Sequence, residues 1–274
     1  MNYKLLALDL DGTALGGDPD LFAPGLAEAA AGAAAGGCTV VVATGRPAAC
    51  LPAAMDPMPD WVGWLILCDG AEIQDARTRA CLWRRAFSAA SLACVEQAAA
   101  RWDLPVEYID RSSCYHLTAA ARRWVEASGP SAFHKNVVAR HGRLLDVPAA
   151  SLAGLDVLKI NMPFVPQELR PGFAAAVGDA ALILDCGPGG LELTAPGAGK
   201  LAAVQVLVRT LGLGMKDVMA LGDSGNDAAL LQAAGLGVAM GNGQAEVLAA
   251  AHTVTGRNTE GGAADAIRRF LLNG

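Results

Sequence analysis

The sequence predicts an α/β protein in which a parallel sheet with crossover helices forms the core and a second, α+β segment is inserted into it. Short apolar runs alternate with helix-like stretches at both ends of the chain, and this alternation predicts a parallel sheet. Two of the runs lead into turns rich in Asp and Gly, at the place where α/β folds bind their ligands. The middle of the chain has a different mixture of strands and helices, which indicates an insertion.

The N-terminal part contains three predicted strands separated by helices. The strands are the apolar run 5–8, the β-branched run 39–43 and the run 64–68. An Ala-rich helix over 24–35 ends at a Gly-Gly pair. A short helix over 47–55 then leads to the third strand.

The middle segment is expected to hold helices and strands that do not continue the alternation of the core. Residues 157–162 alternate apolar and polar side chains, which predicts a half-exposed strand. The turn-rich residues 187–190 mark the return to the core. We therefore expect a core of residues 1–83 and 188–274 with 84–187 inserted. The other predicted elements of the insertion are helices over 88–102, 119–126 and 166–177 and strands over 106–109 and 181–184.

The C-terminal part resumes the alternation of strand and helix. We expect a helix over 201–211, a strand over 218–221, a helix over 227–234 and a strand over 236–240. Their order is that of further parallel strands joined by crossover helices. They complete the predicted core.

The pentad Asp9-Leu10-Asp11-Gly12-Thr13 is the most informative motif. It follows the first strand, and two carboxylates two residues apart on an extended segment point to the same side. One Asp can act as a nucleophile and the other as a proton donor, with a divalent cation screening their repulsion. A calcium loop is the weaker alternative, because the glutamate that such a loop needs is missing.

Three later segments bring further polar groups to strand or helix ends. Thr44-Gly45 follows the second strand and offers a hydroxyl and a backbone N–H to a phosphate. Lys200 begins a helix, where a cation opposes the helix dipole but suits a phosphate. The hexad Gly222 to Asp227 follows a further strand. Taken singly, Thr44 could be a helix cap, Lys200 a solvated lysine and Asp227 a first-turn acid.

In this order and at these positions, the four segments resemble the motifs of the haloacid dehalogenase (HAD) superfamily of phosphatases, and more narrowly its Cof-type branch. The resemblance implies a Rossmann-like core with an inserted α+β cap of the C2 type over 84–187. It covers the core, and one departure is visible: the family often has Asn-Gly-Ala after its third core strand, where this chain has Asp69-Gly70-Ala71. Asp-Gly serves the same tight turn, so this departure does not change the expected fold.

The resemblance also implies a role for each motif residue. Asp9 would attack phosphorus and form an aspartyl-phosphate, and Asp11 would act as general acid and then base. The phosphoryl oxygens would be held by Thr44, Lys200, Asn226 and the backbone N–H groups of Leu10 and Gly45. The cofactor would be Mg²⁺, with Asp9, Asp11 (through its backbone carbonyl), Asp223 and Asp227 as ligands or as neighbours of the ligands.

The implied function is Mg²⁺-dependent hydrolysis of the phosphomonoester of a small phosphorylated metabolite, such as a sugar phosphate or a phosphorylated cofactor. A phosphomutase would share the nucleophile and acid, but that branch usually carries a smaller cap. A non-enzymatic protein that binds Mg²⁺ or phosphate would have lost a catalytic residue, and all the expected ones are present. Substrate selectivity is expected in the cap, where the polar residues His116, Lys159 and Asn161 form no motif.

Composition limits the partners. The chain of 274 residues has a net charge of −6 and no basic block, so we expect no nucleic-acid partner. The uncharged stretch 29–45 is better explained by a helix and a strand than by a membrane span, and no obligate protein partner is inferred. Seven scattered cysteines without a C-x-x-C pair predict reduced thiols in a cytoplasmic protein. The four histidines show no ligand spacing, and we interpret them as ordinary.

Overall fold

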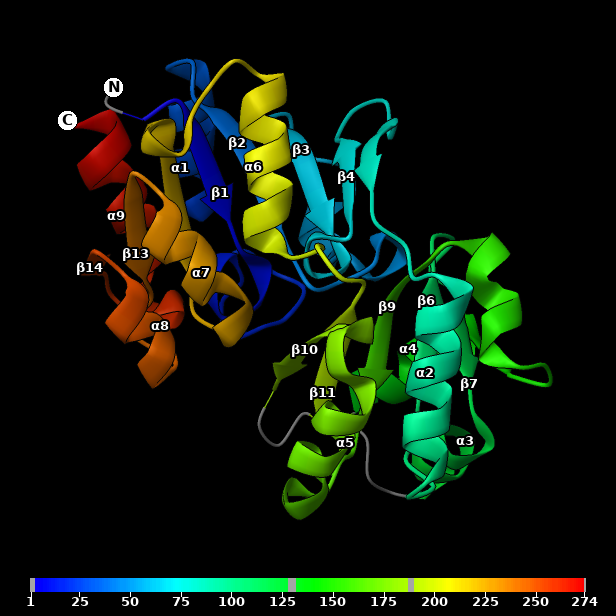
Figure 1. Cartoon of the computed structure of the whole chain (residues 1–274). Helices are drawn as coiled ribbons and strands as arrows, with labels where there is room; N and C mark the ends of the chain where they lie inside the picture. The colour runs from blue at the N-terminus through cyan, green and yellow to red at the C-terminus, as the bar shows by residue number, and fades with distance from the viewer. Residues whose placement is uncertain (1–2, 128–131, 187–189, 274) are drawn as a thin grey trace. The chain divides into compact units, whose positions relative to one another are not determined.

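The computed structural model describes residues 3–127, 132–186 and 190–273 and divides the chain into two compact units (Figure 1). The first unit comprises Met1–Arg46, Leu51–Arg84 and Gly199–Gly274. The second comprises Pro47–Cys50 and Arg85–Ala198. Each unit is built around its own sheet.

The first unit contains an eight-stranded sheet in the order β14-β13-β12-β1-β2-β3-β4-β5. The pairs from β14 to β3 are parallel, whereas β4 and β5 are antiparallel additions at one edge. The strands are β1 (Leu5–Leu8), β2 (Thr39–Ala43), β3 (Val62–Leu67), β4 (Glu72–Asp75), β5 (Cys81–Arg84), β12 (Val218–Gly222), β13 (Leu236–Ala239) and β14 (Thr253–Val254).

Strand order reverses at β1, and this reversal positions the functional residues. From β1 the chain moves outward through β2 and β3, and after the insertion it returns to β12 on the other side of β1. Leu8, the last residue of β1, pairs with Val42 of β2 and Leu221 of β12. The carboxyl ends of the three strands are therefore level, at the place where open α/β sheets generally bind their ligands.

Helices cover both faces of this sheet (Figure 1). Alternate residues of β1 point to opposite faces. Leu5 and Ala7 share a buried apolar cluster with residues of α6 and α7, and α1 and α9 pack against each other and lie on the opposite face. The helices are α1 (Leu26–Ala35), α6 (Lys200–Thr210), α7 (Gly225–Ala233), α8 (Ala245–Ala250) and α9 (Gly262–Ile267).

The second unit contains a six-stranded sheet in the order β10-β11-β9-β6-β7-β8, with only the β7–β8 pair parallel. The largest apolar cluster of the unit joins this sheet to α2 and α5 through buried residues such as Tyr108, Ile160 and Phe173. The elements are α2 (Ala89–Ala100), β6 (Glu107–Asp110), β7 (Tyr115–Leu117), α3 (Ala119–Glu126), α4 (Ala132–His141), β8 (Gly142–Leu144), β9 (Val157–Met162), α5 (Arg170–Val177), β10 (Leu182–Asp185) and β11 (Leu191–Thr194).

The structure differs from the sequence-based expectation in several places. The sheet of the first unit is mixed because the hairpin of β4 and β5, which was not predicted, extends its edge. β11 lies after the predicted return but pairs with β9 and β10, so the second unit extends to Ala198. The predicted helix 47–55 is two short 3₁₀ turns, Ala48–Cys50 and Ala53–Met55. β9 is mostly buried rather than half-exposed, since Lys159 is only 3% exposed and is paired with Glu192. The turn residues 187–189 lie outside the described residues.

Candidate active site

Asp9 is the first residue after β1 and stands at the point where strand order reverses. Its backbone N–H still donates to the carbonyl of Leu221 in β12, at 3.1 Å, so the two strands hold its position. Its side chain is almost fully buried. A π-type turn, Leu10–Ala14, follows and contains Gly12 with φ of 75°. A Cβ at Gly12 would lie 2.2 Å from a carboxylate oxygen of Asp223, so this turn requires glycine.

Lys200 is fully buried and bridges two carboxylates. Its Nζ lies 2.6 Å from Oδ1 of Asp9 and 2.7 Å from Oδ1 of Asp227. Burial by itself would lower the pKa of Lys200, but the carboxylates of Asp227 and Asp9 raise it well above its usual value. The lysine is therefore a permanent cation at the centre of the site.

Asp223 directly follows β12, and the first turn of α7 supplies Asn226 and Asp227. Asp227 is the third residue of α7, and its Oδ2 accepts the N–H groups of Asp223 at 3.1 Å and Ser224 at 3.2 Å, which closes a capping box at the start of the helix. Asp223 accepts a hydrogen bond from the hydroxyl of Thr13 at 2.9 Å. The two motifs at the ends of the chain thus hold each other in place.

Asp9, Asp223 and Asp227 form one carboxylate group, in which one oxygen from each residue lies within 4.8 Å of the others. Burial raises the pKa of Asp9 well above its usual range, against the opposing effect of Lys200. Burial also raises the pKa of Asp223 to about 6. Lys200 contacts two of the three carboxylates, and when all three are ionised two negative charges remain for a divalent cation to balance.

Asp11 is placed differently from the other acids. Its side chain is 55% exposed and accepts two hydrogen bonds from Arg46, one from Nε at 2.9 Å and one from Nη2 at 2.6 Å. This two-point ion pair fixes the plane as well as the position of the carboxylate. Asp11 does not join the group of three carboxylates through its side chain.

The predicted phosphate ligands all lie in the first unit, Leu10, Thr44 and Gly45 just after strands and Lys200 and Asn226 in the first turns of helices. Thr44 directly follows β2, is fully buried, and its hydroxyl accepts the N–H of Arg46 at 3.1 Å. Gly45 follows it, and Leu10 begins the turn after Asp9. Asn226 donates from Nδ2 to Oδ1 of Asp69 at 2.7 Å. Asp69 stands where the family often has Asn. Its carboxylate accepts a hydrogen bond from the side-chain amide of Asn226, the same amide that is predicted to hold phosphate.

Comparison with known proteins assigns this arrangement to a family. The family model described as haloacid dehalogenase-like hydrolase matches residues 6–267. This chain is a haloacid dehalogenase-like hydrolase. The match spans both units of the structure, and it confirms the resemblance found in the sequence motifs.

Relatives of this hydrolase include proteins that match along its whole length and others that match in part. It is 28% identical over 272 residues to the Bacillus subtilis protein YxeH, with 98% of this chain and 99% of that protein covered. It is also 46% identical to the 5-amino-6-(5-phospho-D-ribitylamino)uracil phosphatase YcsE of the same organism, but only over 90 residues. These residues cover 33% of this chain and 36% of that protein.

Solved structures of the family share the fold of this hydrolase. The HAD subclass IIB sugar phosphatase BT4131 aligns with a TM-score of 0.80 at 22% identity, over 97% of this chain and 98% of that one. A haloacid dehalogenase-like hydrolase from Bacteroides thetaiotaomicron aligns with a TM-score of 0.78 at 24% identity, over 97% and 99%. The predicted fold class, a HAD core with a second α+β unit, and the enzyme class, a HAD-type phosphatase, are confirmed.

The sequence did not predict the contacts that Arg46 makes with Asp11 and Thr13 makes with Asp223. Thr13 belongs to the first motif, but its bond to Asp223 links residues 210 apart in sequence and has no local signal. Arg46 follows the Thr44-Gly45 pair directly, and this adjacency to a phosphate-binding turn was the available signal. In the described residues no helix is long and apolar enough to cross a membrane.

Proposed function

We propose that this hydrolase removes the phosphoryl group from a small phosphorylated metabolite, a sugar phosphate or a phosphorylated cofactor, through an aspartyl-phosphate on Asp9. The observation that carries the proposal is the buried ammonium of Lys200 between Asp9 and Asp227 at the carboxyl ends of the strands. The relatives named as acting on a ribityl phosphate and on sugar phosphates support the substrate class.

A divalent cation, Mg²⁺ in our proposal, fits the residues present. Asp9, Asp223 and Asp227 offer only oxygen donors, which suit a hard cation, and they carry more negative charge than Lys200 balances. The backbone carbonyl of Asp11 is the fourth proposed ligand. When bound, the cation would neutralise charge on the phosphoryl oxygens and on the carboxylates.

In the first step a carboxylate oxygen of Asp9 attacks phosphorus and the bond from phosphorus to the ester oxygen breaks. Asp11 gives its proton to the departing alkoxide, so the alcohol leaves neutral. Lys200, Asn226, the hydroxyl of Thr44 and the N–H groups of Leu10 and Gly45 hold the phosphoryl oxygens. Asp9 acts as nucleophile because its carboxylate is fixed by Lys200 and excluded from bulk water.

In the second step water attacks the phosphorus of the aspartyl-phosphate. Asp11, now a carboxylate, takes the proton of that water, the bond from Asp9 to phosphorus breaks, and inorganic phosphate is released. The pair that Asp11 makes with Arg46 holds the carboxylate form in place between the two steps. Arg46 is thus a positioning residue for the acid and base.

The experiment that tests the proposal is a turnover screen of the purified protein. Phosphorylated sugars, nucleotides and cofactors are incubated with Mg²⁺, and released phosphate is measured. After brief reaction with a substrate and acid quenching, mass spectrometry should find a phosphoryl group on the peptide that contains Asp9. Release of phosphate without any such adduct under conditions that trap acyl phosphates would contradict the covalent route.

Analysis of the reaction products distinguishes a phosphomutase from the proposed hydrolase. A mutase given a hexose bisphosphate and a hexose monophosphate would isomerise the monophosphate without net release of phosphate. The hydrolase proposed here would release one inorganic phosphate for each ester bond broken. A non-enzymatic binding protein would do neither.

A further inference from the structure

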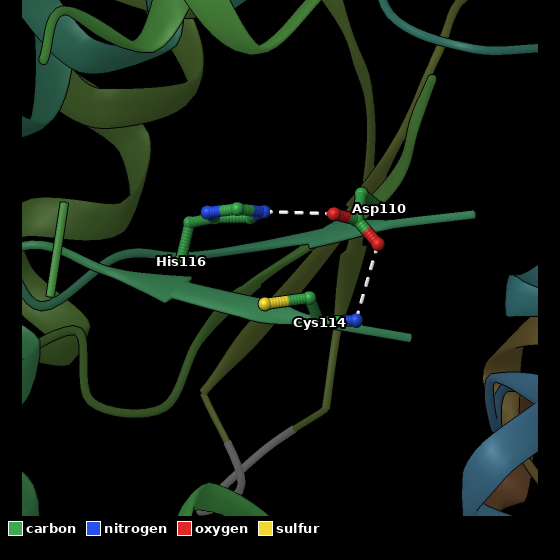
Figure 2. Close-up of side chains that lie close together, drawn as sticks. All are labelled: Asp110, Cys114 and His116. Atoms are coloured by element: carbon green, nitrogen blue, oxygen red, sulfur yellow. Dashed lines mark hydrogen bonds and ion pairs between the residues drawn. The ribbon is translucent and has the colours of Figure 1, made fainter. Parts of the chain in front are cut away.

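The hairpin of β6 and β7 in the second unit carries three side chains with metal-binding chemistry on one face. Asp110 ends β6, and its backbone N–H donates to the carbonyl of Cys114 at 3.1 Å, so the two residues face each other across the turn. Cys114 directly precedes β7 and His116 is the second residue of that strand, so the two side chains are two positions apart. Figure 2 shows the three side chains grouped at this end of the hairpin, with the imidazole of His116 aimed at Asp110.

The ligand atoms are already close together. A carboxylate oxygen of Asp110, the sulfur of Cys114 and a ring nitrogen of His116 all lie within 4.8 Å of one another. Nε2 of His116 is 2.8 Å from Oδ2 of Asp110. Three donors this close together could share one ion, which would leave one position of a tetrahedron open.

The other oxygen of Asp110 is used to hold the carboxylate still. Oδ1 accepts the N–H of Ser112 at 2.8 Å, the hydroxyl of Ser112 at 2.6 Å and the N–H of Cys114 at 3.1 Å. Oδ2 is therefore presented to His116 in a fixed direction. Hydrogen bonds to the outer oxygen of a ligating carboxylate are the usual support of a metal ligand.

The environment and the donor types favour zinc over a hard cation. The side chains of His116 and Asp110 are only 12% and 6% exposed, and Cys114 is half-buried. Mg²⁺ and Ca²⁺ take oxygen ligands, whereas a mixed nitrogen, sulfur and oxygen set suits Zn²⁺. This set also differs from the all-oxygen group of Asp9, Asp223 and Asp227.

We propose that Asp110, Cys114 and His116 bind one zinc ion, with water as the fourth ligand. The ion takes the place of the hydrogen on Nε2 of His116, whose neutral ring then carries its proton on Nδ1, and it displaces the thiol proton of Cys114, which is released to solvent. Zinc between Nε2 and Oδ2 requires a separation of roughly 3.3 Å, so the two atoms move apart by about 0.5 Å from their hydrogen-bonded distance. Bound zinc would join β6 to β7 at the turn end of the hairpin.

The test uses Co²⁺ as a spectroscopic substitute for zinc in the full-length, untagged protein. The protein is stripped with a chelator, saturated with Mg²⁺ to occupy the oxygen site, and titrated with Co²⁺. We expect one equivalent to produce a thiolate-to-cobalt charge-transfer band in the near ultraviolet, which zinc then abolishes. The band should be lost in Cys114→Ser and in His116→Ala and kept in the controls Cys81→Ser and His141→Ala.

Cobalt at the carboxylate site cannot imitate this result, because that site has no sulfur. Asp223→Asn should therefore keep the band. X-ray absorption of the zinc-loaded wild type gives a test without variants, and one sulfur at about 2.3 Å is expected in the zinc shell. The proposal is overturned by folded wild-type protein that yields no thiolate band, by a band that persists in Cys114→Ser, or by a zinc shell without sulfur.

Discussion

At the scale of single residues, the chemistry of this hydrolase depends on how a few charges are paired. Asp9 and Asp227 share the ammonium of Lys200, whereas Asp11 is paired with Arg46. A carboxylate fixed by a buried cation is suited to attack, and an exposed one on an arginine is suited to exchange protons with substrate and water. Asp9 and Asp11, only two residues apart, thus have different proposed roles because their side chains pair with different cations.

Asp9→Asn should keep the fold and lose turnover. The change is nearly isosteric but removes the attacking charge, so we expect kcat to fall by roughly three orders of magnitude or more. The exposed residue Asp60 provides the matched control Asp60→Asn, which should keep the wild-type rate. A tenth of the wild-type rate in Asp9→Asn, with contamination and deamidation excluded, would rule out Asp9 as the nucleophile.

Arg46→Ala should affect esters according to their leaving groups. If Arg46 positions Asp11 as the acid, hydrolysis of alkyl phosphates, which need a proton on the departing oxygen, should slow by about 10²-fold or more. p-Nitrophenyl phosphate, whose leaving group needs little protonation, should slow much less. Arg46→Lys keeps the charge but not the two-point contact and should behave as Arg46→Ala does. An equal loss on both classes of ester would show that Arg46 acts in another way.

The pKa of Asp223 predicts how metal and pH act together on stability. A carboxyl group whose pKa is raised on folding from 3.8 to about 6 favours the folded state at low pH. In the metal-free protein this contribution is lost as the pH rises from about 4 to 6. Mg²⁺, which binds the ionised form, should therefore raise Tm more at pH 7 than at pH 5. Equal shifts in Tm at both pH values would contradict the assignment of Asp223 as a ligand.

Activity should also depend on the same ion. Chelator should abolish turnover and Mg²⁺ should restore it, because the carboxylates repel each other and the substrate phosphate without a cation. Ca²⁺ should inhibit, since its larger and more flexible shell disturbs the in-line geometry. Full activity in rigorously metal-free buffer would overturn the proposed cofactor.

At the scale of elements, the turn Leu10–Ala14 shows how local backbone shape serves the site. It carries Asp11 and Thr13 past the end of β1 and brings Gly12 against Asp223. The positive φ of Gly12 allows the tight turn, and its lack of a side chain allows the close approach. The element therefore sets the distance between the first and last motifs.

The substitution Gly12→Ala tests whether the close approach of Gly12 to Asp223 matters, and Gly37→Ala is the matched control because Gly37 also has a positive φ. Gly37 also has a positive φ, of 91°, but an added Cβ there meets nothing within 4 Å. Both variants carry the backbone strain, of about 1–2 kcal/mol, so both should lower Tm. Only Gly12→Ala pushes on Asp223, so only this variant should lose activity, by about tenfold or more. Similar activity in the two variants would mean that the approach to Asp223 is unimportant.

At the scale of the whole molecule, the proposed chemistry and the predicted selectivity fall in different units. Every residue assigned to phosphoryl transfer lies in the first unit. The second unit offers polar side chains on its sheet, such as Lys159 paired with Glu192 at 2.7 Å. We expect the second unit to discriminate among substrates and to exclude water rather than to supply reacting groups.

Lys159→Met should therefore change the relative kcat/KM among phosphate esters. Hydrolysis of a small generic ester should change by less than roughly tenfold. The measurement is kcat/KM over a panel of phosphate esters for this variant. The double variant Lys159→Met with Glu192→Gln is measured beside it, because it removes both charges of the pair. If folded, metal-competent variants lose activity on every ester, the second unit supplies chemistry and the proposed division is wrong.

Elements whose signals are local could be predicted from the sequence. β1, β2 and β12 were predicted within one residue, because a short apolar run that is buried on both faces needs no distant information. The Asp-rich turns after β1 and β12 were also visible, since strand ends and glycine-containing turns follow from neighbouring residues. The family followed from the order of those motifs.

The contacts between groups far apart in the chain could not be predicted, because they depend on how the strands are arranged in the sheet. Lys200 and Asp9 are 191 residues apart, and their contact depends on β12 lying beside β1. The hairpin of β4 and β5, the place of β11, and the pairing of Arg46 with Asp11 likewise depend on strand order and burial. Asp110, Cys114 and His116 looked ordinary in sequence, because a hairpin brings side chains together across its turn without leaving a periodic signal.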